Sequence, residues 1–301
     1  CRTGRASEVF MAIFETVAPV TFCALIGYLW ARGGLAYETA FVTRIVTYVG
    51  FPCLIFKTLI TVEVSAATLL RMGGLALVTS AAFALIGAVA LKVMALERPA
   101  FLPSLTFANT GNMGLSLCLL AFGDNGLALA IGYFVVSAML VFVVGPALAS
   151  GTFRPSAILK VPMVWATLAA VPAIWTDWQL PGWLFNSLNL VGGIAIPLML
   201  ITLGVSLNQL RVGSLGRAFK LAVLRLVMGF GVGLAVASLL GMEGAERGVL
   251  IVECAMPVAV YNYVHAEMYK TRPAEVAGLV MVSTVLSFAT LPALMWFVMG
   301  G

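Results

Sequence analysis

The residues best suited to chemistry lie in two short polar interruptions of an otherwise apolar chain. The first, TFANTGNMGLS at 106–116, combines two Asn, two Thr and two Gly. The second, ECAMPVAVYNY at 253–263, contains a carboxylate, a proline and an asparagine. At membrane depth, irregular polar backbone survives only where it is buried in protein or lines a cavity. Both stretches therefore predict parts of a binding site if the surrounding sequence spans a bilayer.

The composition requires a membrane. Hydrophobic residues make up 62% of the 301 residues, charged residues 10%, and the mean hydropathy is +1.08. A soluble globule carries roughly 25% charged residues, so the chain is an all-α polytopic membrane protein. The net charge of +5 fits cytoplasmic loops better than a nucleic-acid partner. The five cysteines show no CxxC or His-Cys spacing, which argues against a disulfide framework, a zinc site or another bound cofactor.

Apolar runs long enough to cross a bilayer predict ten transmembrane helices in one transporter-sized unit, 1–301. A polar linker at 150–160 divides them into two sets of five. The expected spans are 9–30, 38–60, 69–94, 99–122, a fifth that ends near 148, 161–175, 184–207, 218–240, 245–268 and 274–299.

The two halves resemble each other. Phe51-Pro52 matches Ile196-Pro197 at an offset of 145, and VSAMLVFVVGPAL from Val136 matches VSTVLSFATLPAL from Val282 at an offset of 146. Repeat one is 9–149 and repeat two is 158–299. Because each repeat has five spans, the second must be inverted. The two polar interruptions fall in the fourth and ninth spans, which should therefore be broken helices at corresponding positions of the two repeats. Inverted repeats with interrupted helices are typical of secondary transporters.

The positive charges predict the orientation. Of the 17 basic residues, 12 lie toward loops 1–2, 3–4, 5–6, 7–8 and 9–10, which should be cytoplasmic, so both termini should lie outside. These are Arg32, Arg44, Lys92, Arg98, Arg154, Lys160, Arg211, Arg217, Lys220, Arg225, Lys270 and Arg272; the other 5 are Arg2, Arg5, Lys57, Arg71 and Arg247.

The first interruption should leave two half-helices, with the positive end of the second near Asn112. Free amide donors and the helix dipole favour an anion there, and a small carboxylate suits these donors. The alternative, a glycine face that packs on a neighbour, would explain Gly111 and Gly114 but not the asparagines. The expected substrate pocket comprises Asn109, Thr110, Gly111, Asn112, Pro257, Val258, Tyr261 and Asn262.

Glu253 is the single residue that most strongly suggests a function, because placing a carboxylate in the middle of a membrane span costs about 2.5 to 3.5 kcal/mol. Its presence would be explained if it bound Na⁺ or carried a proton. Asn109 and Ser137 could supply further oxygen ligands for Na⁺. The alternative is a protonated Glu253 hydrogen-bonded to a neighbouring helix. The only histidine, His265, has a suitable ordinary pKa for a proton relay, but we expect an ordinary interfacial residue.

No enzyme is predicted. HExxH, GxSxG and P-loop patterns are absent from the sequence. A serine nucleophile needs a positioned base, and His265 should lie at the wrong depth for Ser116 or Ser137. An intramembrane enzyme is therefore a weak alternative.

The motifs FANTGNMGLSLCLLAFG, GFPCLIF, AIPLMLITLGVSL and ECAMPVAVYNYVHAEMY, which are spread over nearly the whole chain, resemble the auxin efflux carrier family, particularly its bacterial malonate-type transporters. The resemblance implies ten helices in two inverted repeats with crossed broken helices 4 and 9. It also implies an elevator motion of transport helices 3–5 and 8–10 against scaffold helices 1, 2, 6 and 7, in a homodimer of the bacterial inner (plasma) membrane.

In plant relatives an Asn-Thr pair at the first break binds the substrate carboxylate, which implies that role for Asn109 and Thr110. Those relatives have Pro before the Asn, where this chain has Ala108, so the break here should rely on Gly111. The fold is similar to that of bile acid sodium symporters. Their Glu-x-x-Met segment is similar to Glu253 through Met256, which implies a Na⁺ position.

The expected function is secondary active transport of a small organic anion, a mono- or dicarboxylate, coupled to Na⁺ or H⁺. Two alternatives remain open. One is an anion channel. The other is a sodium symporter of bile acid type for larger amphipathic anions, which is disfavoured because Met256, Tyr261 and Tyr263 would crowd the pocket.

Overall fold

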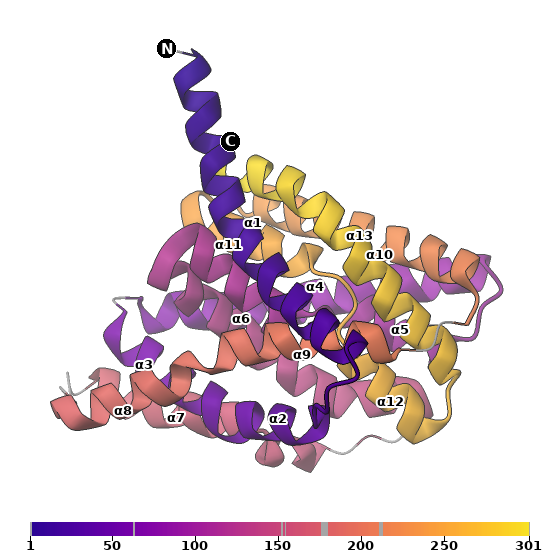
Figure 1. Ribbon diagram of the computed structural model, residues 1–301, viewed down its shortest axis with the longest axis horizontal. Coiled ribbons are helices and arrows are strands. Elements are labelled where there is room, and N and C mark those ends of the chain that lie inside the picture. Colours follow the sequence, from indigo (N-terminus) through magenta and orange to yellow (C-terminus); the bar gives the residue numbers. More distant parts are fainter. Residues whose placement is uncertain are drawn as a thin grey trace.

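The computed structural model describes residues 2–62, 64–151, 153, 155–175, 180–210 and 213–300, and these residues are helical apart from short connections (Figure 1). The described residues contain one isolated β-bridge and no strand. The predicted all-α class is therefore confirmed.

The first half of the chain forms α1 (Arg2–Arg32), α2 (Thr39–Ile45), η1 (Val46–Gly50), α3 (Phe51–Thr61), α4 (Ala66–Val93), α5 (Arg98–Thr106), η2 (Thr110–Gly114) and α6 (Leu115–Ser150). The second half forms η3 (Pro155–Lys160), α7 (Pro162–Trp175), α8 (Gly182–Gly193), α9 (Ala195–Gln209), α10 (Leu215–Leu239), α11 (Gly244–Ala255), α12 (Tyr261–Tyr269) and α13 (Pro273–Gly300). The local sequence explains several helix starts. Proline stands in the first turn of α3 and α5, where its missing N–H costs nothing.

Seven helical segments in the described residues are long and apolar enough to cross a membrane, so the chain is a multi-pass membrane protein. One of them, Thr110–Ser150, has 41 residues, about twice the length that one crossing needs. Its helix α6 contains Gly123 at φ 65° and ψ −159°, a conformation open mainly to glycine. The chain therefore bends directly after 122, where the fourth expected span ends and the fifth begins.

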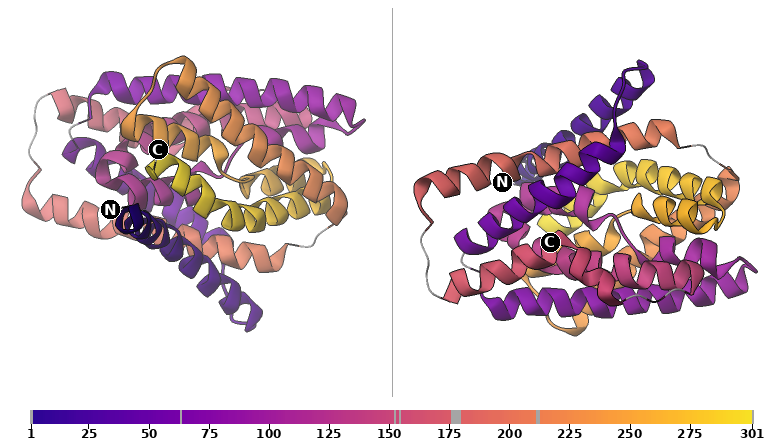
Figure 2. Two further views of the ribbon diagram at one scale, coloured as in Figure 1. Left: turned by 90° about the horizontal axis from the view of Figure 1, so that it is seen from above. Right: turned by 90° about the horizontal axis from the view of Figure 1, so that it is seen from below.

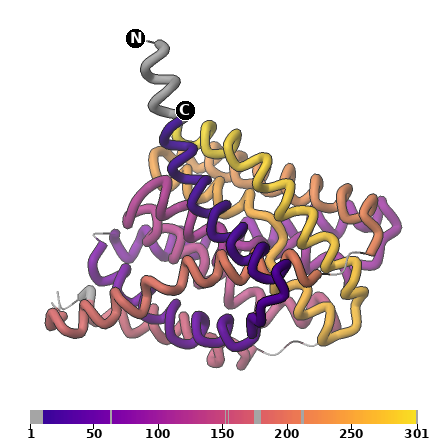
Figure 3. The backbone as a smooth tube through the Cα atoms, viewed as in Figure 1, coloured from indigo at the N-terminus to yellow at the C-terminus, as the bar shows by residue number. Residues whose placement is uncertain are grey.

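Two groups of helices can be distinguished, and they touch, since α1 also packs on α13 and α6. Helix α1 lies along α9, and it crosses the remaining helices at an angle (Figure 2). A Cβ on Gly27 or Gly204 would approach a backbone oxygen of the opposite helix within 2 Å, so both glycines are needed for this contact. In the other group, α4 packs on α6, and α13 packs along α10 (Figure 3).

One basic residue differs from its expected place. We counted Arg225 with the cytoplasmic loops, but it belongs to α10 and its side chain is fully buried within the protein. Counting charges assigns every arginine near a span end to a loop, whereas packing decides which of them is enclosed. Arg154 and Arg211, also in that count, lie outside the described residues.

Candidate functional site

The two polar interruptions meet. Between α5 and η2, and between α11 and α12, the chain is extended, and Ala108 forms an antiparallel bridge with Val258. The Asn109 N–H donates to the Pro257 carbonyl at 2.8 Å, and the Ala259 N–H donates to the Phe107 carbonyl at 3.2 Å. Because both helices are broken here, this pairing satisfies backbone groups that lipid would leave without partners.

Part of the backbone at this crossing stays free to bind a ligand. The Asn109 carbonyl accepts hydrogen bonds from the N–H groups of Met113 and Gly114, at 3.3 and 3.2 Å. The N–H groups of 110–112, which directly precede them, have no backbone partner in the described part of the chain. The Asn109 side chain is only 4% exposed, and its Nδ2 also lacks a partner there. Donors without partners at a helix start are groups that can bind an anion.

A cavity of about 580 Å³ opens beside these donors. Residues 109–112 form one wall, and α6 and α12 add aromatic and aliphatic side chains. The opposite wall comes from α2, η1 and α9, with hydroxyl groups at helical spacing. The polar residues that line it are Thr39, Thr43, Arg44, Thr47, Asn109, Thr110, Asn112, Thr202, Ser206 and Tyr261.

The structure brings together five of the eight predicted pocket residues. Asn109, Thr110, Gly111, Asn112 and Tyr261 line the cavity. Gly111 has a packing role besides, because a Cβ there would lie 2.7 Å from the Phe134 ring. The break itself lies earlier, in the extended residues 107–109, so our expectation that Gly111 creates it was wrong.

The other three residues stand behind the cavity and hold the crossing. Pro257 accepts the bond from Asn109, and the Val258 N–H donates to Ser283 Oγ at 3.1 Å. Asn262 is 2% exposed, and its Nδ2 donates to the carbonyl oxygens of Phe107 and Ala259 at 3.0 and 3.2 Å. Their surroundings indicate a positioning role in the described structure.

Glu253 lies deeper, against the other broken helix. It is fully buried, its Oε1 accepts a long bond from Cys118 Sγ at 3.9 Å, and its Oε2 has no partner among the described residues. A Cβ on Gly114 would lie 2.4 Å from Oε2, so the carboxylate touches the start of α6. Met256 and Ser137 are buried too, but no hydrogen bond in the described part of the chain joins Ser137 or Asn109 to Glu253.

Sequence reasoning missed the wall contributed by α2, η1 and α9. The three threonines of α2 and η1 recur every four residues, as do Thr202 and Ser206 of α9, so each set lies on one helix face. That spacing is a readable signal, but which face meets the cavity depends on contacts between distant segments. Arg44, counted only as a loop charge, also lines this wall.

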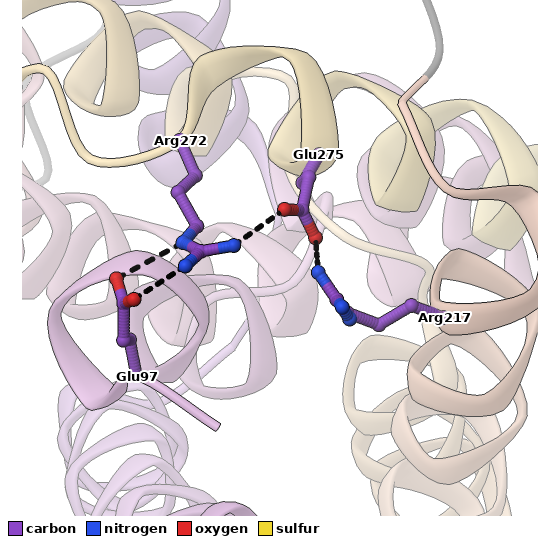
Figure 4. A network of polar contacts seen from close by, with 4 residues as sticks. All are labelled: Glu97, Arg217, Arg272 and Glu275. Carbon is purple, nitrogen blue, oxygen red and sulfur yellow. Dashed lines mark hydrogen bonds and ion pairs between the residues drawn. The ribbon is translucent and has the colours of Figure 1, made fainter. Parts of the chain in front are cut away.

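A network of ion pairs lies on the surface of the same bundle. Figure 4 shows that each carboxylate oxygen of Glu97 accepts a hydrogen bond from one nitrogen of Arg272. The third nitrogen of Arg272 donates to Glu275, which also accepts from Arg217. This network links the starts of α5, α10 and α13. The hydrogen bonds from Arg272 hold the pKa of the Glu97 carboxyl below its ordinary value.

Comparison with known proteins gives a consistent picture. A family model described as "Membrane transport protein" matches residues 12–152 and 150–295. An uncharacterized transporter of Methanocaldococcus jannaschii is 24% identical over 312 residues, covering 96% of this chain and 100% of the relative. An uncharacterized transporter of Methanothermobacter thermautotrophicus is 28% identical over 298 residues, covering 94% and 98%.

Proposed function

Because the chain belongs to the membrane transport protein family that includes the auxin efflux carriers, we propose that it is a secondary active transporter of a small organic anion. The observation that carries the proposal is a set of N–H groups at 110–112 that have no backbone partner among the described residues, in a segment that lines a cavity of about 580 Å³. A carboxylate bound there would accept hydrogen bonds from these groups and from the Asn109 amide.

The charge of the cavity supports an anion over a cation. Arg44 is the one charged side chain among the described residues that line it, and no carboxylate does. A cation would need several oxygen ligands with negative charge, whereas a carboxylate gains from a helix start and an arginine.

The position of the cavity supports access from the cytoplasmic side. Its walls include the start of α2, which follows the first basic loop, and the last two turns of α9, which lead to another. The proposed transport cycle moves α4–α6 and α10–α13, which the ion network of Figure 4 ties together, against α1–α3 and α7–α9. This elevator scheme includes ten spans in two inverted repeats in a plasma membrane, with both termini outside and two copies per assembly.

Glu253 is the proposed coupling residue. Its carboxylate is buried, with one oxygen that has no partner in the described part of the chain. Uptake of Na⁺ or a proton would stabilise it, since an unpaired buried charge is costly. Gly114 connects Glu253 to the proposed substrate site. The carboxylate contacts Gly114, and the N–H groups of 110–112 belong to the same short helix, η2. Occupation of one position should therefore change the affinity of the other.

The experiment that tests the proposal is thermal unfolding of the detergent-purified protein with acetate, malonate or succinate, in NaCl or in KCl at equal ionic strength. A ligand at a hundredfold excess over its Kd stabilises the folded state by about 2.7 kcal/mol. We expect one carboxylate to raise the unfolding temperature, and to do so more strongly in NaCl if Na⁺ is the coupling ion. No shift with any carboxylate would contradict the anion site.

A further inference from the structure

Arg225 is a charged residue in the middle of the bundle, and the transport scheme above gives it no role. It is fully buried in α10 and lies over the Phe83 ring of α4, with its Cζ 4.4 Å from the ring centroid. Its Nη2 donates to the Cys254 carbonyl at 3.1 Å, while Nε and Nη1 have no partner in the described residues. An arginine so enclosed is retained at a considerable cost in desolvation.

The contact with Cys254 places the guanidinium at the end of a half-helix. Helix α11 ends at Ala255, one residue later, so its last carbonyl groups have no partners within the helix and carry partial negative charge. Gly229 and Gly233 lie one and two turns after Arg225 on the same face of α10. A Cβ on either would come within 3 Å of Cys254, so this face receives the broken end of α11 directly.

The thiol of the same cysteine is held from the other side. Tyr133 Oη of α6 lies 3.6 Å from Cys254 Sγ and 2.8 Å from Thr79 Oγ1 of α4. Residue 254 is thus fixed through its carbonyl by Arg225 and through its side chain by Tyr133. Its neighbour Glu253 is therefore held on a stretch of backbone whose position three other helices determine.

Charge balance connects the two residues further. Among the described residues, Arg225 and Glu253 are the two charged side chains with no exposed surface. No ion pair of the described chain involves either of them. A charge enclosed without a counter-charge is strongly unfavourable. The Arg225 guanidinium contacts Cys254, the residue next to Glu253, and charges in a protein interior act across a low effective dielectric.

We propose that Arg225 is the positioning residue and internal counter-charge of Glu253. It holds the end of α11, and its fixed positive charge compensates the carboxylate when no cation is bound. This inference rests on the proposed coupling role of Glu253. With Arg225 in place the unloaded pair is neutral overall, so the empty carrier can return without moving the charge of an uncompensated carboxylate.

The test combines Arg225→Met and Arg225→Lys with Glu253→Gln, alone and in pairs, in the full-length protein in detergent. Yield of folded protein and unfolding temperature are measured in NaCl and in KCl. We expect Arg225→Met to lower both strongly, Glu253→Gln to restore most of the loss, and Arg225→Lys to retain most of the stability and of any difference between the two salts. If Arg225→Met does not fold at all, recovery of folded protein in the double variant supports the pairing equally.

Arg247→Met is the matched control, since Arg247 also lies over a ring, Phe297, at 5.2 Å, but on the far end of α11. Its effect should add to that of Glu253→Gln without rescue. If Glu253→Gln rescues neither the yield nor the unfolding temperature of Arg225→Met, Arg225 only caps α11 and the proposal is overturned. A wild-type protein indifferent to Na⁺ would count against Na⁺ coupling alone, because the rescue is measured in KCl as well.

Discussion

Asn109 joins the two functions of the crossing in one residue. Its backbone N–H pairs with Pro257 and its carbonyl receives two N–H groups, while its buried side-chain nitrogen, beside the cavity, has no partner among the described residues. The backbone duties survive substitution, but the amide does not. A change of the side chain therefore separates ligand binding from the fold of the crossing.

We predict that Asn109→Ala weakens carboxylate binding about 10- to 100-fold, because a hydrogen bond to a charged group contributes about 1.5 to 3 kcal/mol. The unfolding temperature without ligand should change little. Ligand-induced shifts measured over a concentration series give the ratio of Kd values. Asn186→Ala, on the exposed surface of α8, is the control; equal affinities in the two variants would remove Asn109 from the site.

Gly114 offers a second test at this scale. It has helical dihedrals, φ −59° and ψ −55°, so alanine fits the backbone, yet its Cβ would lie 2.4 Å from Glu253 Oε2. We predict that Gly114→Ala displaces the carboxylate and abolishes the difference between NaCl and KCl in the thermal assay. Retention of that difference would show that the cation binds elsewhere.

At the scale of the elements, the crossing of the two broken helices was largely readable from the sequence. Asn, Gly and Pro within apolar runs marked both interruptions, since lipid cannot solvate such backbone. The identity of the residues at the break was not readable. The chain opens at 107–109 without a glycine because the pairing of Ala108 with Val258 supplies the missing hydrogen bonds, and this pairing joins residues 150 positions apart.

The burial of Arg225 and the threonine wall escaped prediction for a related reason. Hydropathy and charge counts describe each span on its own, whereas both features depend on which helix faces which. Asn262 shows the same limit. It was expected to bind substrate, but in the structure its amide ties Phe107 to Ala259.

The packing of α10 on α11 gives a stability prediction with an internal control. A Cβ on Gly229 would lie 2.2 Å from the Cys254 carbonyl oxygen, while no atom of the described residues lies within 4 Å of one on Gly231. Gly229→Ala should therefore destabilise the protein by about 1 to 3 kcal/mol or more, as overpacking does. Gly231→Ala should be neutral or stabilising by up to about 1 kcal/mol, because alanine favours helix. Unfolding in denaturant measures both, and equal effects would contradict this contact.

At the scale of the whole molecule, the ion network of Glu97, Arg272, Glu275 and Arg217 holds together three helices of the proposed moving body. The Glu97 pKa is depressed by Arg272, so the contribution of Glu97 to stability is present above its unfolded pKa of about 4.3 and is lost as the pH falls through the lower folded value.

We predict that Glu97→Gln lowers the unfolding temperature slightly at pH 7 in low salt, and that the difference from wild type fades in high salt and below about pH 4. The pair is largely solvent-exposed, so the effect should be small. Thermal unfolding at several pH values checks this. A difference that stays constant down to pH 3 would mean that Glu97 acts through packing rather than charge.

We propose that this molecule carries an organic anion by exposing the site at the crossing of its two broken helices to one side of the membrane at a time. Counterflow tests it most directly: proteoliposomes are loaded with unlabelled acetate, malonate or succinate and diluted into the labelled anion. We predict that labelled anion accumulates transiently inside for at least one of the three, that accumulation saturates with concentration, and that Asn109→Ala slows it. Saturation and counterflow require a binding site that faces one side at a time. Flux that is proportional to concentration and shows no transient accumulation would contradict the account, because an open channel conducts in that way.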